Sequence, residues 1–333
     1  MLAKLKKKYI GDWDFYKKYL LLAIPMILQN AITNLVSFLD NIMVGQLGTE
    51  QMSGVAIVNQ LIFVYNLAIF GAVSAASIFG AQYFGKGNHK GHMYSFRFKL
   101  YATLLVTGGA ILLFLTKGSA LISLYLTDTV GNGATDLALQ YGLEYLAIMM
   151  VGLIPSAVNQ SYATNIKETG QTFIPMLASF VAVGTNAILD YLMIFGIGPF
   201  PELNVTGAAI ATVLAQAIVT LMFVCFAMKD SLIFQDIHIF KKPKADYIRS
   251  IIHIGLPTSI QNMLFTGISM ILARFVASYG DAAIAVQKVG SQIESISWMT
   301  ADGFAAAVNS FIAQNHGAGN KVRIRKGYSC AMG

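Results

Sequence analysis

The 333-residue sequence is poor in charge, because only 12% of its residues are Asp, Glu, Lys or Arg. An average water-soluble protein carries about twice that share, so the composition excludes a soluble enzyme with a charged shell. The two cysteines, Cys225 and Cys330, are too few for a disulfide framework or a cysteine zinc site. The five histidines lack metal-ligand spacing, and no phosphate-binding loop of the Walker type occurs. These absences argue against a metal centre and against direct use of a nucleotide by this chain.

Apolar residues make up 56% of the chain, the mean hydropathy is +0.61, and the apolar residues gather in long runs. A run of about 20 residues is long enough to cross a hydrocarbon core of about 30 Å as a helix. The sequence therefore predicts an all-α, polytopic protein embedded in a lipid bilayer. Its helices are expected at residues 17–44, 52–80, 98–118, 133–156, 172–195, 205–228, 250–279 and 284–312, with a ninth beginning near Gly327.

The net charge of +7 comes from 23 basic and 16 acidic residues. Twenty of the 23 basic residues lie in one alternate set of connections, whereas the opposite set holds only Lys117. A nucleic-acid partner is not expected, because the basic residues are spread over short connections instead of one face of a domain. Basic connections mark the cytoplasmic side of a membrane protein. This predicts a multi-pass protein of the cell (inner) membrane with a cytoplasmic N-terminus.

Residues 25–88 align with residues 257–320 at a constant offset of 232 and without a gap. The identical pairs include Pro25/Pro257, Gln29/Gln261, Asn30/Asn262, Gly48/Gly280, Gly71/Gly303, Gln82/Gln314 and Gly85/Gly317. Six predicted helices precede the second copy, so both copies enter the bilayer in the same orientation, and parallel repeats of this kind are a common transporter plan.

The repeat predicts two parallel six-helix bundles, of which the second is incomplete. The expected parts are a cytoplasmic N-terminus (1–19), an N-lobe bundle (20–228), a cytoplasmic linker (229–249) and a partial C-lobe (250–333). We therefore expect the chain to be a fragment of a twelve-helix protein.

A carboxylate within a spanning helix requires either a partner or a function, because it costs about 2.5–3.5 kcal/mol at a helix centre on insertion scales. Asp40, Asp190 and Thr212 all fall about 6–11 Å from the outward ends of their helices. Asn186 precedes Asp190 by four residues and so shares its helix face. These four groups offer oxygen ligands to a sodium ion, or a carboxylate pair able to share a proton. The alternative is that each one only hydrogen-bonds a neighbouring helix.

Two prolines interrupt predicted helices at equivalent places in the repeat, Pro25 and Pro257. Each frees a backbone carbonyl and permits a helix bend, which serves either as a moving part or as a static kink. Gln29 and Asn30 follow Pro25 and are candidates for a substrate cavity, as is Glu294 near the middle of its helix. A structural pairing of Glu294 with a polar neighbour is the alternative.

The chain resembles the multidrug and toxic compound extrusion (MATE) family, and the resemblance covers essentially its whole length. The motifs that carry it are Pro25-x-x-x-Gln29-Asn30, Asp40-Asn-Ile-Met-Val-Gly45-Gln-Leu-Gly48, Ala81-Gln-Tyr-Phe-Gly85, Asn186-x-x-x-Asp190, Gly207-Ala-Ala-Ile-Ala-Thr212 and Ala313-Gln-Asn-His-Gly317-Ala-Gly319-Asn320. The resemblance implies two six-helix bundles around a V-shaped cavity. It also implies that Asp40, Asn186, Asp190 and Thr212 form the cation site of the N-lobe.

The function implied by the resemblance is that of a secondary active transporter and not an enzyme. Such a protein exports organic, often cationic, drugs and toxic compounds against an inward flow of H⁺ or Na⁺. We expect a monomer without any cofactor apart from the coupling ion. Phe265 departs from a sodium-coupled branch of the family, which carries an acidic residue there, so coupling through that position is not expected. The alternatives are a lipid-linked oligosaccharide flippase of the same superfold and a truncated fragment that transports nothing.

Overall fold

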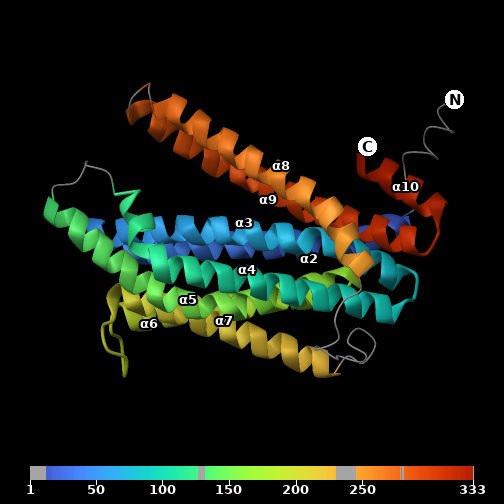
Figure 1. The fold of residues 1–333 in the computed structure, drawn as a ribbon, viewed down its shortest axis with the longest axis horizontal. Helices are drawn as coiled ribbons and strands as arrows, with labels where there is room; N and C mark the ends of the chain where they lie inside the picture. The colour runs from blue at the N-terminus through green and yellow to red at the C-terminus, as the bar shows by residue number, and fades with distance from the viewer. Residues whose placement is uncertain (1–12, 127–131, 230–244, 278, 280, 333) are drawn as a thin grey trace.

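The computed structural model describes residues 13–126, 132–229, 245–277, 279 and 281–332. Every element within these ranges is a helix, which confirms the all-α class (Figure 1). The helices are α2 (Trp13–Gly45), α3 (Thr49–Gly85), α4 (His89–Ser123), α5 (Asn132–Glu168), α6 (Phe173–Ile194), α7 (Asn204–Lys229), α8 (Ala245–Ala277), α9 (Asp281–Gly317) and α10 (Lys321–Met332). Most of the expected N-terminal segment and linker lies outside the described residues.

Six of the described helices, α2 to α7, are long and apolar enough to cross a membrane. Their large apolar side chains are exposed around the bundle, as on α4, where Leu105, Leu112 and Leu115 are 64–77% exposed. Such a surface is stable in contact with lipid chains and unstable in water. The chain is therefore a multi-pass membrane protein.

Several helices are longer than the apolar runs predict. Helix α4 begins at His89 instead of residue 98, α5 continues to Glu168 instead of residue 156, and α10 begins at Lys321, six residues before Gly327. The assignment of Lys99 to the twenty basic residues of the connections is wrong, because Lys99 lies fully buried within α4. Hydropathy marks only the lipid-facing part of a helix, whereas a buried polar partner allows the helix to continue.

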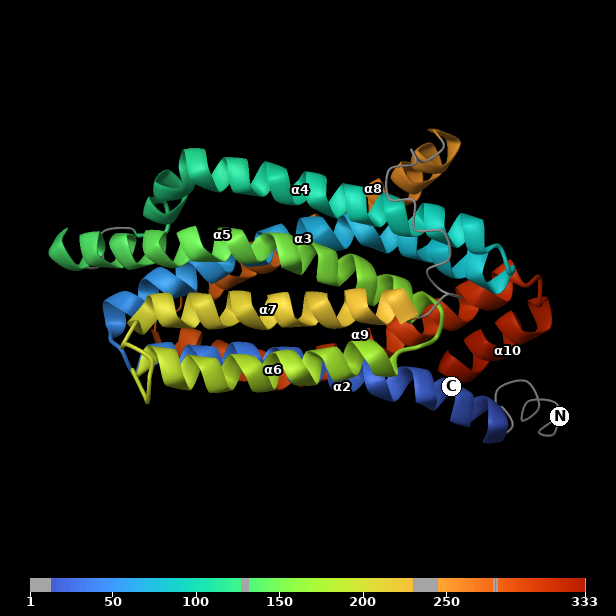
Figure 2. The same ribbon diagram turned by 90° about the horizontal axis from the view of Figure 1, so that it is seen from below.

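Helices α2 to α7 form one bundle, and α8 and α9 form a hairpin inclined across it (Figures 1 and 2). The end of the molecule where α3 passes to α4 and α5 passes to α6 is called the basic end here. The hairpin meets the bundle near this end and diverges from it toward the other end (Figure 1). Helix α2 packs on α9 through a small apolar cluster formed by Tyr19, Ala23, Met26, Ala307 and Phe311.

The two repeats cross each other at the basic end through equivalent glycines. A Cβ atom at Gly85 of α3 would collide with the Gln314 carbonyl of α9, and a Cβ atom at Gly317 of α9 would collide with the Gln82 carbonyl of α3. Gly85 and Gly317 are equivalent in the repeat, as are Gln82 and Gln314. The crossing is therefore reciprocal, and only glycine permits so close an approach of the two backbones.

Pro25 lies inside α2, which continues on both sides of it. Proline cannot donate to the carbonyl four residues before it, here that of Leu21. The Thr172 hydroxyl, at the start of α6, donates to that carbonyl over 3.3 Å. On the other face of α2, Gly303 of α9 lies so close to Ile27 that a Cβ atom would be 2.7 Å from the Ile27 Cα. In this conformation the proline segment is thus held by both α6 and α9.

Thr172→Val is expected to lower the thermal stability of the protein, because the Leu21 carbonyl loses its hydrogen bond from the Thr172 hydroxyl. A backbone carbonyl that is kept from water and left without a partner costs about 1–3 kcal/mol. The measurement is the unfolding temperature in detergent, compared with Thr164→Val. The Thr164 hydroxyl bonds only to Gln160 of its own helix. Equal unfolding temperatures for the two variants would show that Thr172 does not support the proline segment.

Candidate functional site

The carboxyl groups of Asp40 on α2 and Asp190 on α6 are neighbours inside the bundle, close enough for the charge of one to affect the other. The Asp190 residue has no exposed surface, and Asp40 is partly buried. Two carboxylates held this close repel one another when both are ionised, and the repulsion disappears when a proton or a metal cation binds between them. The pair can therefore take up one positive charge.

Asn186 and Thr212 complete the group around this pair. Asn186 is buried one helical turn before Asp190, and its Nδ2 donates to the Thr212 Oγ1 over 3.2 Å. The Thr212 hydroxyl donates in turn to the Ala208 carbonyl over 3.0 Å. Gly207 permits this contact between α6 and α7, because a Cβ atom there would lie 2.7 Å from the Met193 carbonyl oxygen. The structure thus brings together the four residues that the sequence analysis selected.

The donor set of this cluster suits a cation. Four buried oxygens accept no hydrogen bond of ordinary geometry: Asp40 Oδ1, Asp190 Oδ1, Asp190 Oδ2 and Asn186 Oδ1. All four are hard oxygen acceptors, the kind of ligand that a hard cation prefers, and a proton between the carboxyl groups satisfies the same need. No cluster of three His, Cys, Asp or Glu residues occurs within the described ranges, so a transition-metal site is not indicated there.

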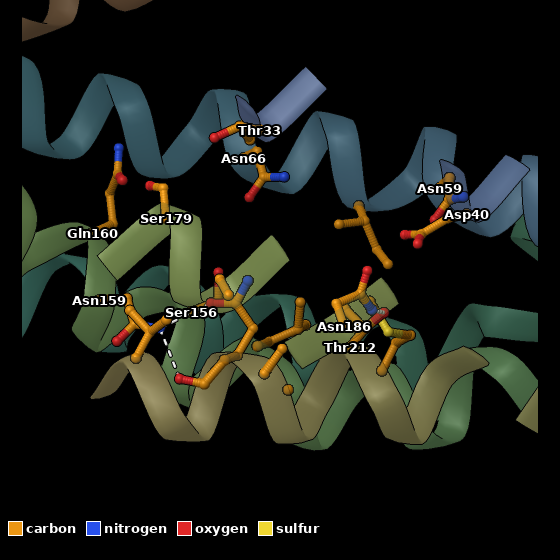
Figure 3. A pocket seen from close by; sticks show the side chains of 18 of the residues that line it. Thr33, Asp40, Asn59, Asn66, Ser156, Asn159, Gln160, Ser179, Asn186 and Thr212 are labelled. Atoms are coloured by element: carbon orange, nitrogen blue, oxygen red, sulfur yellow. Dashed lines mark hydrogen bonds between the residues drawn. The ribbon is translucent and has the colours of Figure 1, made fainter. Parts of the chain in front are cut away.

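A cavity of about 610 Å³ opens beside the pair, between α2, α3, α5, α6 and α7 (Figure 3). Asp40, Asn186 and Thr212 lie at one end of it, and Asn159 and Gln160 lie at the other. Amides dominate its polar lining, and the nine amide residues are Gln29, Asn41, Asn59, Gln60, Asn66, Asn159, Gln160, Asn186 and Gln216. Asp40 is the one charged residue among the described side chains that line it.

The remaining candidates take different places. Gln29 lines the cavity, whereas Asn30 donates to the Met299 carbonyl on α9 over 3.4 Å. Glu294 is exposed on α9 and accepts a hydrogen bond of 2.9 Å from the Trp298 indole. Pro25 does not line the cavity, and Pro257 lies exposed within α8. The structure therefore groups Gln29 with the cavity but not Asn30 or Glu294.

The sequence reasoning missed two parts of this site. Tyr145 of α5 is buried beside Asp40 and Asp190, and its hydroxyl donates to the Asn59 side chain over 3.5 Å. At the far end of the cavity, the Asn159 amide donates to Gln216 over 2.8 Å and accepts from Thr220 over 2.8 Å. Amides on otherwise apolar helices were the available signal, because such groups are expensive in lipid and so mark buried positions.

The fold and the site define a multi-pass helical membrane protein that encloses a polar cavity beside a neighbouring pair of carboxyl groups. The family model described as MatE matches residues 25–192 and 257–332, so the chain belongs to this family. The resemblance drawn from the motifs is thereby confirmed. The two matched segments also agree with the two copies found by aligning the sequence with itself.

Curated relatives are similar over nearly all of the chain. The chain is 27% identical over 315 residues to "Probable multidrug resistance protein NorM" of Thermotoga maritima, covering 93% of this chain and 65% of that protein. It is 26% identical over 330 residues to "Multidrug export protein MepA" of Staphylococcus haemolyticus, covering 95% and 68%. It is also 26% identical over 302 residues to "FAD transporter" of Shewanella oneidensis, covering 87% and 63%. The chain thus spans about two thirds of the length of these relatives.

Solved structures show the same fold. A structure titled "Crystal structure of MATE in the bent conformation" superposes with a TM-score of 0.83 at 22% identity, over 95% of this chain and 69% of that one. A transporter of the MOP superfamily from Pyrococcus furiosus, whose title reports a "reverse polarity of binding pocket", has a TM-score of 0.82 at 22% identity, over 95% and 68%. At these identities the likeness establishes the fold alone.

Proposed function

We propose that the complete protein is a cation-coupled antiporter that exports organic, often cationic, compounds across the cell membrane as a monomer. Membership of the MatE family supports this proposal, as do the names of two relatives, a multidrug resistance protein and a multidrug export protein. The proposed coupling ion is H⁺ or Na⁺, and its site comprises Asp40, Asn186, Asp190 and Thr212.

The observation that carries the proposal is the coupled carboxyl pair at one end of an amide-lined cavity. Asp40 lines the cavity and also contacts Asp190, so it joins the two places. An entering cation cancels one negative charge of the pair; when the pair already shares one proton, this neutralises Asp40, the only acidic residue among the described lining residues. A cationic compound in the cavity then loses its electrostatic partner, which couples entry of one cation to release of the other.

The basic end is proposed to face the cytoplasm, since it carries the lysine-rich connections. The four-residue site lies toward the opposite, outward end of the N-lobe. A membrane potential of 100 mV, negative inside, is worth about 2.3 kcal/mol per charge that enters. That energy supports an outward concentration ratio of about 50-fold for each net charge moved.

A lipid-linked oligosaccharide flippase of the same superfold is the alternative transport function. Its substrate carries a pyrophosphate, which is best held by Lys or Arg side chains. The described residues that line the cavity include neither, and this favours a cationic or neutral compound. One relative is named as an FAD transporter. FAD, an anionic dinucleotide, is therefore the best compound with which to test the proposed preference for cations.

The test is transport by the complete protein in proteoliposomes, with a fluorescent organic cation and, separately, FAD. Either a proton gradient or a sodium gradient is expected to drive transport of the organic cation across the membrane. FAD is not expected to be transported. Movement of FAD but not of the cation would overturn the proposed substrate class, and movement of neither would overturn the antiport. The intact mass of the purified protein distinguishes a true loss of activity from a truncated product that cannot transport.

A further inference from the structure

Three buried residues at the basic end form a second charged cluster, separate from the carboxyl pair. The Lys99 Nζ of α4 lies 2.5 Å from the Glu168 Oε1 of α5, and both side chains are at most 3% exposed. His92, about two helical turns before Lys99, is 1% exposed, and its Nδ1 lies 3.8 Å from the Glu168 Oε2. Burying such groups is expensive, and a buried ion pair is seldom retained for stability alone.

The cluster contains proton acceptors without a hydrogen-bond partner. The Glu168 Oε2 and the His92 Nε2 are both buried and accept no hydrogen bond. The His92 Nδ1 lies 3.1 Å from the Gly80 carbonyl, an acceptor, so Nδ1 carries the proton and Nε2 presents a lone pair. The Glu168 Oε1 is already occupied by Lys99 and by the Ser77 hydroxyl at 2.6 Å.

The second copy of the internal repeat lacks two of these three groups. Helices α4 and α10 begin at equivalent positions, His89 and Lys321, which are 232 residues apart. At the same offset, Lys99 corresponds to Ala331 and His92 corresponds to Ile324. Lys99 and His92 are therefore not shared by the two copies of the repeat, and both lie in the lobe that also holds the carboxyl pair.

Buried hydroxyl groups lead from the cavity toward this cluster. Tyr65 lines the cavity, and its hydroxyl lies 2.8 Å from the Thr107 Oγ1. The Thr107 hydroxyl donates to the Thr103 carbonyl over 2.7 Å, and the Thr103 Oγ1 lies 2.9 Å from the Ser161 Oγ. Tyr65, Thr107, Thr103 and Ser161 are all at most 4% exposed, and we call these four residues the hydroxyl ladder.

The ladder ends one helical turn from the charged cluster. Thr103 follows Lys99 by four residues on α4, and Ser161 precedes Asn165 by four residues on α5. Lys99 donates to the Asn165 Oδ1 over 3.2 Å. The pair Lys99–Asn165 therefore lies one helical turn from the pair Thr103–Ser161, at a spacing of about 5–6 Å. The buried Asn165 Nδ2 makes no hydrogen bond. A single water molecule is enough to bridge such a step.

We propose that Glu168, His92 and Lys99 form a second proton site of the N-lobe, and that the hydroxyl ladder carries the coupled proton to it from the cavity. Water molecules bridge the two steps at which no hydroxyl group meets the next one, from Thr107 to Thr103 and from Thr103 to Lys99, because the Thr107 hydroxyl donates to a backbone carbonyl that cannot relay a proton. This inference rests on the proposed function with H⁺ as the coupling ion. One proton enters the cluster from the ladder, is held on Glu168 or His92, and leaves toward the cytoplasmic end of α5. Only the O–H or N–H bond to the transferred proton is broken at each donor and formed at the next acceptor.

Other titratable groups also face the cluster. On α4, His89 faces His92, and on α8, Tyr247 faces Glu168. Lys167 is adjacent to Glu168 on α5. Its backbone carbonyl accepts a hydrogen bond from the Ser310 hydroxyl of α9. The response of the cluster to pH therefore belongs to the group as a whole, and variants at the ladder are cleaner probes than variants at one acid.

The decisive variant is Thr103→Val/Thr107→Val, which keeps the side-chain shapes and removes two hydroxyl groups of the ladder. Thr116→Val is the matched control, since Thr116 is exposed on the same helix and bonds only to the α4 backbone. The complete protein is reconstituted in proteoliposomes for two measurements. One is export of an organic cation driven by a proton gradient. The other is self-exchange of the same compound without a gradient, which needs the conformational change but no net proton transfer.

The ladder variant is expected to slow proton-driven export about tenfold or more, with self-exchange within about twofold of the control. Equal loss of both rates would indicate a structural role, and unchanged rates would show that the ladder carries no proton. Lys99→Met/Glu168→Gln provides a second test, because a merely structural pair is replaceable by neutral groups. Retention of proton-driven export by this variant would overturn the second proton site.

The outcome for the unmodified protein separates this inference from the proposed function. Transport driven by sodium but not by protons would overturn the proton site and leave cation-coupled antiport standing. Transport driven by neither ion would overturn both. Proton-driven transport by the unmodified protein, together with its selective loss in the ladder variant, is the expected result.

Discussion

Asp190→Asn is expected to abolish gradient-driven export, lowering its rate by at least about 100-fold, or about 2.7 kcal/mol. Asp190 has no exposed surface and contacts both Asp40 and Asn186, so the substitution removes a carboxylate from the centre of the site. The asparagine keeps the shape of the side chain but cannot take up a proton or balance a cation. Asp40→Asn is expected to have the same effect, because the pair acts as one unit.

The same substitution separates coupling from folding. Replacing one of two interacting buried carboxyl groups by a neutral amide removes a like-charge repulsion, so the unfolding temperature is expected to stay equal or rise. The matched control is Asp136→Asn, since Asp136 is an exposed acidic residue at the start of α5. Transport assays in proteoliposomes and thermal unfolding in detergent measure the two effects. Full transport by both Asp190→Asn and Asp40→Asn would remove the pair from the mechanism.

Gly85→Ala is expected to separate the two repeats at the basic end and to lower transport by about tenfold or more. The added methyl group would collide with the Gln314 backbone carbonyl, and a backbone cannot rotate away as a side chain does. Gly317→Ala is expected to do the same through the Gln82 carbonyl, because the crossing is reciprocal. Either change therefore destabilises the conformation in which the repeats touch.

Spin labels at Lys86→Cys and Ala318→Cys report this separation, since both side chains are exposed beside the crossing. The native Cys225 and Cys330 are replaced first. The control is Gly108→Ala on α4, where a methyl group meets nothing within 4 Å. We expect a longer label-to-label distance for Gly85→Ala and an unchanged one for Gly108→Ala. An unchanged distance in both would show that the crossing tolerates the methyl group.

Much of the fold was predictable because the bilayer imposes simple rules on sequence. A spanning helix must be apolar over about 20 residues, so composition locates α2 to α7. The self-alignment at an offset of 232 predicts the repeat, and the structure places its equivalent glycines, Gly85 and Gly317, against one another. The helix ends were harder to predict, since a helix continues past its apolar run when its polar residues are buried.

Lys99 shows most clearly where sequence reasoning failed. A lysine near the end of an apolar run reads as part of a hydrated connection, yet this one is fully buried against Glu168, 69 residues away. Asn30 and Glu294 show the same limit. The sequence predicts how far along its helix each residue lies, but not toward which neighbouring helix its side chain is directed. Asn30 contacts α9, and Glu294 contacts Trp298 on its own helix.

The sequence by itself determined the class of the protein, its apolar spanning segments and its duplication, and it predicted a common depth for Asp40, Asn186, Asp190 and Thr212. These features follow from hydropathy and from a fixed rise per residue, which are properties of a single helix. Only the tertiary structure decided that Asp40 meets Asp190, that amides of five helices enclose one cavity, and that Lys99 is buried with Glu168. Each of these contacts joins different helices, and their rotation and packing depend on side chains far apart in the chain.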